Sequence, residues 1–356
     1  MQVIRALIPA DLPAIAALRG RAFRFSEWAT PAELERALQH TFFEHPWKDG
    51  RIASLVYERD GRIVGFLGVI PRPFRWKGRR ITVAISTLFM TDPDDRKFAG
   101  IELLARFFEG PQDLALADSA NDASRLLWTR AGGAVAPGYG FGWTRALRPF
   151  EHAIGQTLGG AGLGLGRGLR PLARLLDAVV IRQGTPPYRL VPERAAGRSV
   201  GLPEFAEAAG SVLRPYPLAS ELDGAALEWV VDWLAGRRDL GPVRLVVVRD
   251  DRGAVRGCYA YAGQRAARSV ICFCAGERDF DTVFDDLCRR AWQEGAVSLE
   301  GRAEGGQLGL FGRRRDVALH HGSHVLVHAR QRELVDVFCR GDGFLSRLDG
   351  EWWMRF

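Results

Sequence analysis

Met90-Thr91-Asp92-Pro93-Asp94-Asp95-Arg96-Lys97-Phe98-Ala99-Gly100-Ile101 joins an expected strand to an expected helix. The period-two apolar pattern over residues 81–90 predicts the strand, and apolar residues at helical spacing over residues 97–108 predict the helix. A strand end followed by a turn and a helix N-terminus gathers backbone amides without intrahelical partners, beside the positive end of the helix dipole. The stretch therefore predicts an anion-binding turn that suits a pyrophosphate.

A second informative stretch, Asn121-Asp122-Ala123-Ser124-Arg125-Leu126-Leu127-Trp128-Thr129-Arg130-Ala131-Gly132-Gly133, follows a short apolar run over residues 114–117. The stretch predicts a helix over residues 122–130, and the Gly132-Gly133 pair is typical of a helix end. The expected order up to this point is strand, helix, helix, three antiparallel strands, helix, strand, helix. This order indicates an α/β or α+β domain with a mixed sheet.

The first stretch resembles the acyl-CoA-binding motif of the GNAT (GCN5-related N-acetyltransferase) superfamily. In that family a strand ends in V-x-P-x-x-R and the chain continues as R/Q-x-x-G-x-G/A. Pro93 and Arg96 fit this pattern, whereas Ala99 replaces the first glycine and Ile101 stands at the second small position. Either the branched side chain of Ile101 crowds a pyrophosphate, or Gly100 shifts the loop by one residue.

The second stretch resembles the later GNAT signature N-x-x-A-x-x-L-Y-x-x-x-G-F. Asn121, Leu127 and Gly132 match it, Ser124 is a small replacement, and Trp128 takes the place of the tyrosine. The family's tyrosine commonly donates a proton to the departing CoA thiolate, which an indole N–H cannot do. The resemblance then implies another acid, protonation by water, or a copy that has lost catalysis.

The resemblance implies a set of site residues and a reaction. The cofactor-binding positions are Phe89, Met90, Thr91, Arg96, Lys97, Phe98, Ala99, Gly100, Ile101, Asn121 and Ser124. In direct transfer an uncharged amine attacks the thioester carbonyl, whose oxygen is polarised by a backbone amide where the strands splay, near residues 89–91. The catalytic positions are Trp128 and two candidate bases, Asp92 and Asp118, with Glu58 as a weaker candidate. Helix capping or a surface position is the alternative for either aspartate, and it is the commoner role of an aspartate at such a place.

The second half repeats the expected order of elements, so we expect tandem GNAT folds of the α/β (α+β mixed sheet) class. The hairpins at residues 57–68 and 248–260 share an Asp and Gly turn, with Gly65 and Gly257 at corresponding points. Residues 275–279 lack the P-x-x-R element, which indicates a degenerate copy. The predicted organisation is a GNAT domain at 1–150, a glycine-rich, amphipathic connecting segment at 151–195 and a degenerate GNAT-like domain at 196–356.

Composition narrows the function classes. The 356 residues carry 49 Lys and Arg against 42 Asp and Glu, and only Lys48, Lys77 and Lys97 are lysines. Because the arginines are scattered among acidic residues, a nucleic-acid groove is not indicated. No signal-peptide core and no apolar run of about 20 residues is present, so a cytoplasmic protein is expected. Five cysteines without C-x-x-C spacing indicate reduced core thiols: Cys258, Cys272, Cys274, Cys288 and Cys339.

Three further patterns leave alternatives open. The amphipathic run over residues 169–181 fits contact with an anionic membrane surface or, as we favour, a helix packed between domains. The histidine cluster His320, His321, His324 and His328 has no acidic or Cys partner at ligand spacing, so no metal site is expected, and a substrate-facing role for one of them stays open. The terminal residues 349–356 predict a last strand, whose tryptophans are typical of a core.

The sequence thus favours an N-acyltransferase that transfers an acyl group, from acetyl-CoA or another acyl-CoA, to a small-molecule or peptide amine. One alternative is a non-catalytic acyl-CoA-binding or scaffold protein, on the grounds of Ala99, Ile101 and Trp128. A second alternative is a FemABX-like aminoacyl transferase, against which the P-x-x-R element argues. The acceptor, the acyl length and the oligomeric state do not follow from the sequence.

Overall fold

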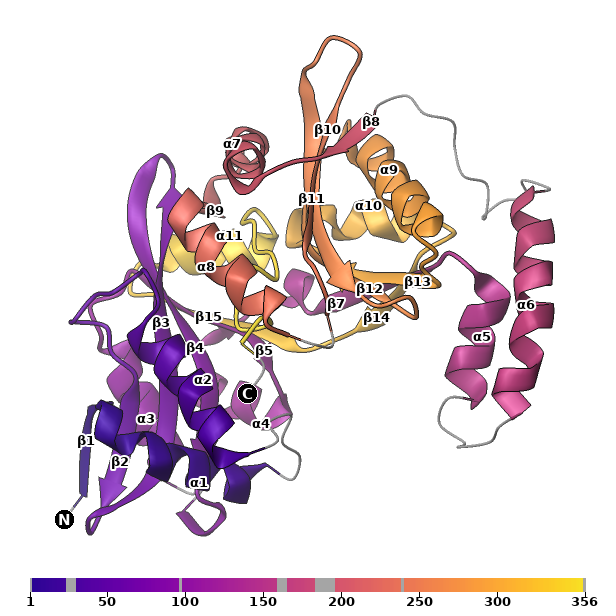
Figure 1. Ribbon diagram of the computed structural model, residues 1–356. Helices are drawn as coiled ribbons and strands as arrows, with labels where there is room; N and C mark the ends of the chain where they lie inside the picture. Colours follow the sequence, from indigo (N-terminus) through magenta and orange to yellow (C-terminus); the bar gives the residue numbers. More distant parts are fainter. Residues whose placement is uncertain are drawn as a thin grey trace. The chain divides into compact units, whose positions relative to one another are not determined.

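The computed structural model describes residues 2–23, 30–95, 98–158, 165–182, 196–237 and 240–354. The chain forms two compact units. The first unit comprises Met1–Gly140, Tyr216–Glu221 and Ser323–Phe356, and the second comprises Phe141–Pro215 and Leu222–Gly322. Both are built on a mixed sheet with helices, as the predicted fold class requires (Figure 1).

The sheet of the first unit is antiparallel except between its fourth and fifth strands. Its strand order is β1 (Gln2–Ala6), β2 (Leu55–Arg59), β3 (Arg62–Trp76), β4 (Arg79–Thr91), β5 (Leu114–Ala120), β15 (His324–His328) and β6 (Ala134–Val135), and β9 (Leu218–Ser220) pairs with β3. Its helices are α1 (Leu12–Ala22), α2 (Pro31–Phe43), α3 (Ala99–Phe108), α4 (Asp122–Arg130) and α11 (Arg332–Arg340). Short 3-10 turns lie at Pro9–Asp11, Pro93–Asp95 and Pro137–Tyr139.

Side-chain alternation along β3 places helices on both faces of this sheet. Phe66 meets Phe42 of α2 edge to face, with ring centroids 5.5 Å apart, on one face. On the other face Gly65 packs closely against Leu103 of α3. A side chain at Gly65 would collide with that leucine, so the glycine permits α3 to lie close to the strand. The sheet is thus enclosed between α1 and α2 on one side and α3 and α4 on the other (Figure 1).

Local capping explains where two of these helices begin. The Thr30 hydroxyl accepts a hydrogen bond from the Glu33 amide (3.2 Å), and the Glu33 carboxylate accepts one from the Thr30 amide (3.1 Å). This confirms the helix start that Thr30 and Pro31 predict. Asn121 caps α4 through its side-chain oxygen, which accepts from the Ser124 amide at 2.9 Å.

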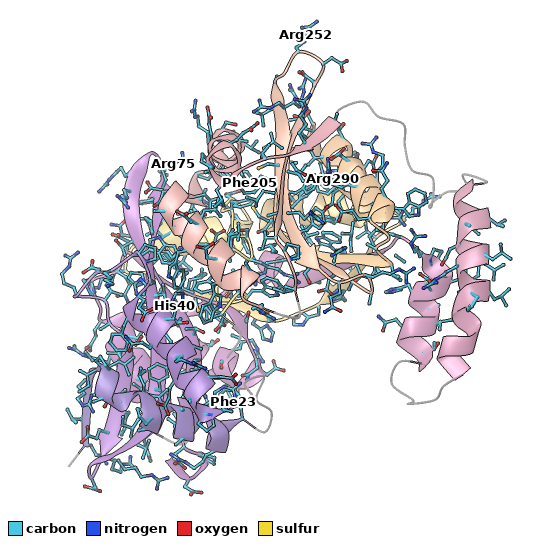
Figure 2. All side chains as sticks on the ribbon, in the orientation of Figure 1. Phe23, His40, Arg75, Phe205, Arg252 and Arg290 are labelled. Carbon is cyan, nitrogen blue, oxygen red and sulfur yellow. The ribbon has the colours of Figure 1, made fainter. Side chains whose placement is uncertain are left out.

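The second unit has its own sheet and helices. The strand order is β8 (Ala196–Ser199), β10 (Arg244–Arg249), β11 (Val255–Gly263), β12 (Arg268–Ala275), β13 (Ser298–Arg302), β7 (Phe141–Ala146) and β14 (Ala318–His321). The helices are α5 (Pro149–Leu158), α6 (Leu165–Arg182), α7 (Leu202–Leu213), α8 (Gly224–Ala235), α9 (Phe280–Gln293) and α10 (Leu308–Arg313), and a 3-10 turn lies at Gly305–Gln307. Arg252 stands at the tip of the β10–β11 hairpin (Figure 2).

The two sheets have the same strand order and the same directions. In each, three antiparallel neighbours lead to one parallel pair, β4–β5 or β12–β13, whose crossover contains one helix, α3 or α9. The strand after the parallel pair is exchanged, because β15 from the end of the chain lies beside β5 and β7 from the first half lies beside β13. The shared strand order is compatible with the repeat expected from the two Asp-Gly hairpins.

The exchange changes the domain boundaries. A cut near residue 150 would leave β7 in the first unit, whereas β7 pairs with β13 and β14 in the second. Residues 216–221 and 323–356, predicted to lie in the second domain, belong to the first unit. The reason is that strand pairing over a long sequence separation leaves no mark in the local pattern.

The connecting segment expected at 151–195 holds two helices in its described part. α5 and α6 run side by side (Figure 1). The Asp177 carboxylate of α6 accepts hydrogen bonds from the amides of Phe150 (2.9 Å) and Glu151 (3.1 Å) at the start of α5. Glu151 in turn pairs with Arg174 of α6 and with Arg265 of the β11–β12 connection. These contacts hold the helix pair against the second unit. Residues 159–164 and 183–195 of the predicted connecting segment lie outside the described part.

Aromatic side chains fill the second unit where β12 and β13 part. These strands pair only through Arg268–Ser269 and Leu299–Glu300. Beyond that point Trp143 packs on Gly301 of β13, and Phe311 of α10 stacks on Trp143 with ring centroids 5.1 Å apart. Phe311 also contacts Phe273 of β12 at 6.1 Å. Side chains thus occupy the place at which the two parallel strands separate.

Replacing Phe311 by alanine should lower the free energy of unfolding by about 3–5 kcal/mol, because it leaves a cavity among buried rings. Urea unfolding followed by tryptophan fluorescence would measure the loss. Leu319→Ala on the same unit is the control, since Leu319 is exposed and its truncation should cost less than about 1 kcal/mol. Equal losses for the two variants would contradict the packing role of Phe311.

Candidate functional site

The first unit has a gap in its sheet between β4 and β5. The two strands pair in parallel only through Val83–Ile85 and Leu114–Leu116. Farther along, β4 contains a bulge, because Leu88 and Phe89 both fall opposite Leu67 of β3. Leu88 adopts a left-handed φ of 49°, which is costly for a leucine and marks a constrained position. The bulge re-aims β4, and the strands separate.

A pocket of about 360 Å³ lies at this separation. Its volume is within the range of small-molecule sites. It is lined by residues of β4, β5, α4, the end of α1 and the C-terminal segment: Phe23, Ser86, Thr87, Leu88, Phe89, Ala117, Ser119, Ala120, Asn121, Ser124, Trp128, Glu351 and Trp352. Figure 2 labels Phe23, which follows α1. Four of the predicted site residues, Phe89, Asn121, Ser124 and Trp128, are among them.

The N-terminus of α3 lies next to this pocket. The first intrahelical bond runs from the Glu102 amide to the Phe98 carbonyl (3.1 Å), so the amides of the first turn are directed out of the helix. Ala99 is buried against the core, whereas the Ile101 side chain is 38% exposed. Gly100 packs between α4 and the pocket, because an added Cβ would lie 3.3 Å from Leu127 and 3.5 Å from the Phe89 ring.

Asp92 is held by two arginines from other elements. Its Oδ2 lies 3.1 Å from Arg21 Nε of α1 and 2.7 Å from Arg62 Nη2 of β3. Burial acts to raise the pKa of Asp92, but the Asp94 amide and the two guanidinium groups outweigh it, so the pKa lies below its usual value. Asp92 is not among the residues that line the pocket. A carboxylate in this state is a weak base, and its geometry indicates a structural role.

Asp118 is fully buried at the end of β5. Its Oδ1 accepts a hydrogen bond from the Glu351 amide at 2.7 Å, and the side chain packs against Gly350. The carboxylate therefore contacts the backbone of the C-terminal segment and does not line the pocket. Asp118 was predicted as a candidate base, and its contacts favour a role in holding that segment.

Trp128 forms part of the pocket wall from within the core. Its ring is almost fully buried and packs edge to face on Phe108 (5.0 Å) and Phe107 (6.1 Å). Asn121 uses its side-chain oxygen to cap α4, so its amide nitrogen remains for other contacts. Met90 is buried in β4, and Thr91 ends that strand. Arg96 and Lys97, also predicted to bind the cofactor, lie outside the described residues.

Solved structures share this architecture. A GCN5-related N-acetyltransferase from Anabaena variabilis ATCC 29413 superposes with a TM-score of 0.61 at 12% identity, over 92% of this chain and 73% of that one. One from Kribbella flavida gives 0.57 at 11% identity, over 92% and 71%. A conserved protein of unknown function from Enterococcus faecalis V583, a probable N-acyltransferase, gives 0.59 at 10% identity, over 92% and 73%. The chain has the GNAT fold. No protein-family profile and no curated protein sequence matches it.

The GNAT fold is the one that the motifs at residues 90–101 and 121–133 predict. Both lie at the split between β4 and β5, the first at the start of α3 and the second along α4. The corresponding split of the second unit is the one filled by Trp143 and Phe311. The pocket described above lies in the first unit, and residues of both motifs lie in or beside it.

The C-terminal segment contributes two pocket residues that sequence reasoning missed. Residues 349–354 form turns rather than the predicted strand. Glu351 and Trp352 are half-buried and line the pocket, whereas Trp353 is fully buried in the core as predicted for these tryptophans. The Ser346-x-x-Asp349 pattern is the sequence signal for a turn here. Asp349 Oδ2 accepts hydrogen bonds from the Ser346 amide and hydroxyl, both at 2.7 Å.

The four histidines divide between the two units. His320 and His321 belong to β14 of the second unit, and His324 and His328 to β15 of the first. His328 stacks on Phe108 with centroids 3.9 Å apart, and burial lowers its pKa. Among the described residues, no three His, Cys, Asp or Glu side chains are grouped as a metal ion requires. In the same part of the chain, no helix is long and apolar enough to cross a bilayer.

Proposed function

We propose that the first unit binds an acyl-CoA, most simply acetyl-CoA, and transfers its acyl group to an amine. The observation that carries this proposal is the pocket at the separation of β4 and β5, next to the N-termini of α3 and α4. The gap leaves backbone groups of both strands without a strand partner, and a pantetheine amide chain can pair with such groups. The amides at the start of α3 would meet the pyrophosphate.

In this reaction the amine nitrogen attacks the thioester carbonyl, a C–N bond forms and the C–S bond breaks. The carbonyl oxygen gains negative charge in the transition state, and a backbone amide at the Leu88–Phe89 bulge is the candidate donor. Trp128 cannot protonate the thiolate. The proton lost by the amine nitrogen as the amide forms is therefore the proposed source of the thiol proton, relayed by water.

A tryptophan at Ser119 tests whether the pocket is the acyl-CoA site. Ser119 is exposed and lines the pocket, so Ser119→Trp places an indole in the cavity without disturbing the core. We expect the dissociation constant for acetyl-CoA, measured by isothermal titration calorimetry, to rise at least about tenfold. Thr129→Trp, at an exposed position of α4 outside the pocket lining, should leave it unchanged. Undiminished binding by Ser119→Trp would contradict the assignment.

A non-catalytic acyl-CoA-binding protein is the second candidate function, favoured by Trp128 at the position of the family's tyrosine. The two candidates differ in one measurement. Release of free thiol from acetyl-CoA in the presence of a primary amine, above the rate without protein, identifies a transferase. Binding of acetyl-CoA without thiol release across a panel of amines identifies the second candidate.

A further inference from the structure

Two buried charged side chains of the sheet in the first unit, Arg72 and Asp118, hold the C-terminal segment, residues 346–352. Arg72 of β3 is 2% exposed, and its Nη1 donates a hydrogen bond to the Leu348 carbonyl at 3.1 Å. Its Nη2 lies 3.8 Å from Oδ1 of the fully buried Asp349. Asp118 of β5 accepts from the Glu351 amide at 2.7 Å. Burying charged side chains is costly unless they are paired, so these contacts with the segment compensate for the burial of the charges.

The attachment determines what faces the pocket. Leu348 before it and Trp353 after it are buried, which fixes the chain on both sides of Glu351 and Trp352. These two residues line the pocket together with Ser86–Phe89 of the bulged strand. The Arg347 guanidinium lies 4.9 Å from the centre of the Trp352 ring and supports its orientation. The segment thus forms one wall of the pocket, and buried residues hold it in place on both sides.

The lining has a distinct chemistry. Among the described residues that form it, Glu351 carries the one ionisable side chain. Four aromatic side chains accompany it, namely Phe23, Phe89, Trp128 and Trp352. Aromatic faces and a carboxylate together attract an organic cation, whereas an anionic acceptor would be repelled by the carboxylate. A primary amine at neutral pH is such a cation.

We infer that Glu351 binds the ammonium group of the acceptor and takes its proton, and that the acceptor is a small cationic amine. The inference rests on the proposed function. One proton passes from the ammonium nitrogen to a Glu351 oxygen, and the freed lone pair then forms the C–N bond as the C–S bond breaks. The amide nitrogen gives up a second proton, the thiolate takes one, and Glu351 returns its own to solvent. Arg72 and Asp118 are positioning residues, because they act through the segment.

The kinetic test uses acetyl-CoA with 1,4-diaminobutane and butylamine as probes. We expect Glu351→Gln to lower kcat/KM about 100-fold for both amines, because general-base catalysis contributes at least this much. Acetyl-CoA binding by calorimetry should stay unchanged, and Glu351→Asp should restore part of the rate. Glu109→Gln, an exposed carboxylate of the same unit outside the lining, is the matched control and should behave as wild type.

A full rate in Glu351→Gln would overturn the inference while leaving the proposed function intact. Wild-type protein that neither binds acetyl-CoA nor releases thiol would instead overturn the proposed function. A binding measurement separates the two further. Benzyltrimethylammonium, a cation that cannot be acylated, should bind wild type and lose at least about tenfold in affinity with Glu351→Gln. Equal affinity for both proteins, or no binding to wild type, would overturn the cation site.

Discussion

Gly350→Ala is expected to destabilise the first unit by about 2–3 kcal/mol and to remove most of its acceptor turnover. A Cβ at this position would overlap the carboxylate of Asp118, which is fully buried, so one of the two groups must shift. Either the carboxylate shifts away from the Glu351 amide or the C-terminal segment detaches. Both outcomes displace Glu351 and Trp352 from the pocket wall. Urea unfolding and amine-dependent thiol release measure the two effects.

A double-mutant cycle identifies the cause. Asp118→Ala alone should cost about 2 kcal/mol, because it leaves the Glu351 amide without its carboxylate acceptor. In that background Gly350→Ala should cost less than about 1 kcal/mol, since the colliding group is gone. Gly20→Ala is the matched control: nothing lies within 4 Å of a Cβ there, and alanine in the interior of α1 should stabilise by about 0.5–1 kcal/mol. Additive losses at Gly350 and Asp118 would contradict the contact.

The features that could be predicted are those whose residues also form the local structure, such as the residues that cap a helix. Asn121 shows this directly, because the same side chain that matches the family signature also caps α4. Thr30 and Pro31 likewise predict the start of α2, which the capping hydrogen bonds confirm. The strands around the split are recognisable from their apolar patterns, since each is buried on both faces. Local chemistry was sufficient for these elements.

Residues brought together from distant parts of the chain could not be predicted in the same way. Asp92 follows the cofactor strand, which made it a candidate base, but Arg21 and Arg62 reach it from α1 and β3. The residues next to Asp92 in the sequence do not predict these two arginine partners. Glu351 enters the pocket from the far end of the sequence through Asp118, by a contact between a carboxylate and a backbone amide. Such a contact leaves no periodicity, so sequence reasoning assigned the segment to a strand.

The exchange of β7 and β15 belongs to the same class of feature. Each strand has a pattern that fits either sheet, and only pairing with β13 or β5 decides its place. The shared strand order is compatible with the predicted pair of similar folds, whereas the two compact units do not divide near residue 150. Sequence order records which elements exist, whereas the choice of neighbour depends on tertiary packing.

Acid should destabilise the first unit through His45, which packs beside the anchor of the C-terminal segment. His45 is 5% exposed, and burial, with Lys48 and Arg72 nearby, lowers its pKa to about 4. The unfolded chain takes up this proton at a pKa near 6.5, so between these values it binds more protons than the folded protein. Stability contributed by neutral His45 is present above pH 6.5 and is lost as the pH falls toward 4, by up to about 3 kcal/mol.

His45→Phe should remove this part of the pH dependence, because phenylalanine keeps a ring beside Trp47 and carries no proton. His40→Gln on the surface of α2, where His40 pairs with Glu44, should leave the dependence as in wild type (Figure 2). Free energies of unfolding in urea at pH 7, 5.5 and 4.5 measure the difference.

Arg72 both stacks on Trp47 at 3.9 Å and binds the Leu348 carbonyl. A proton on His45 therefore repels the guanidinium that holds the segment, and the acid loss should appear in acceptor turnover before global unfolding. Parallel pH curves for wild type and His45→Phe would contradict this coupling.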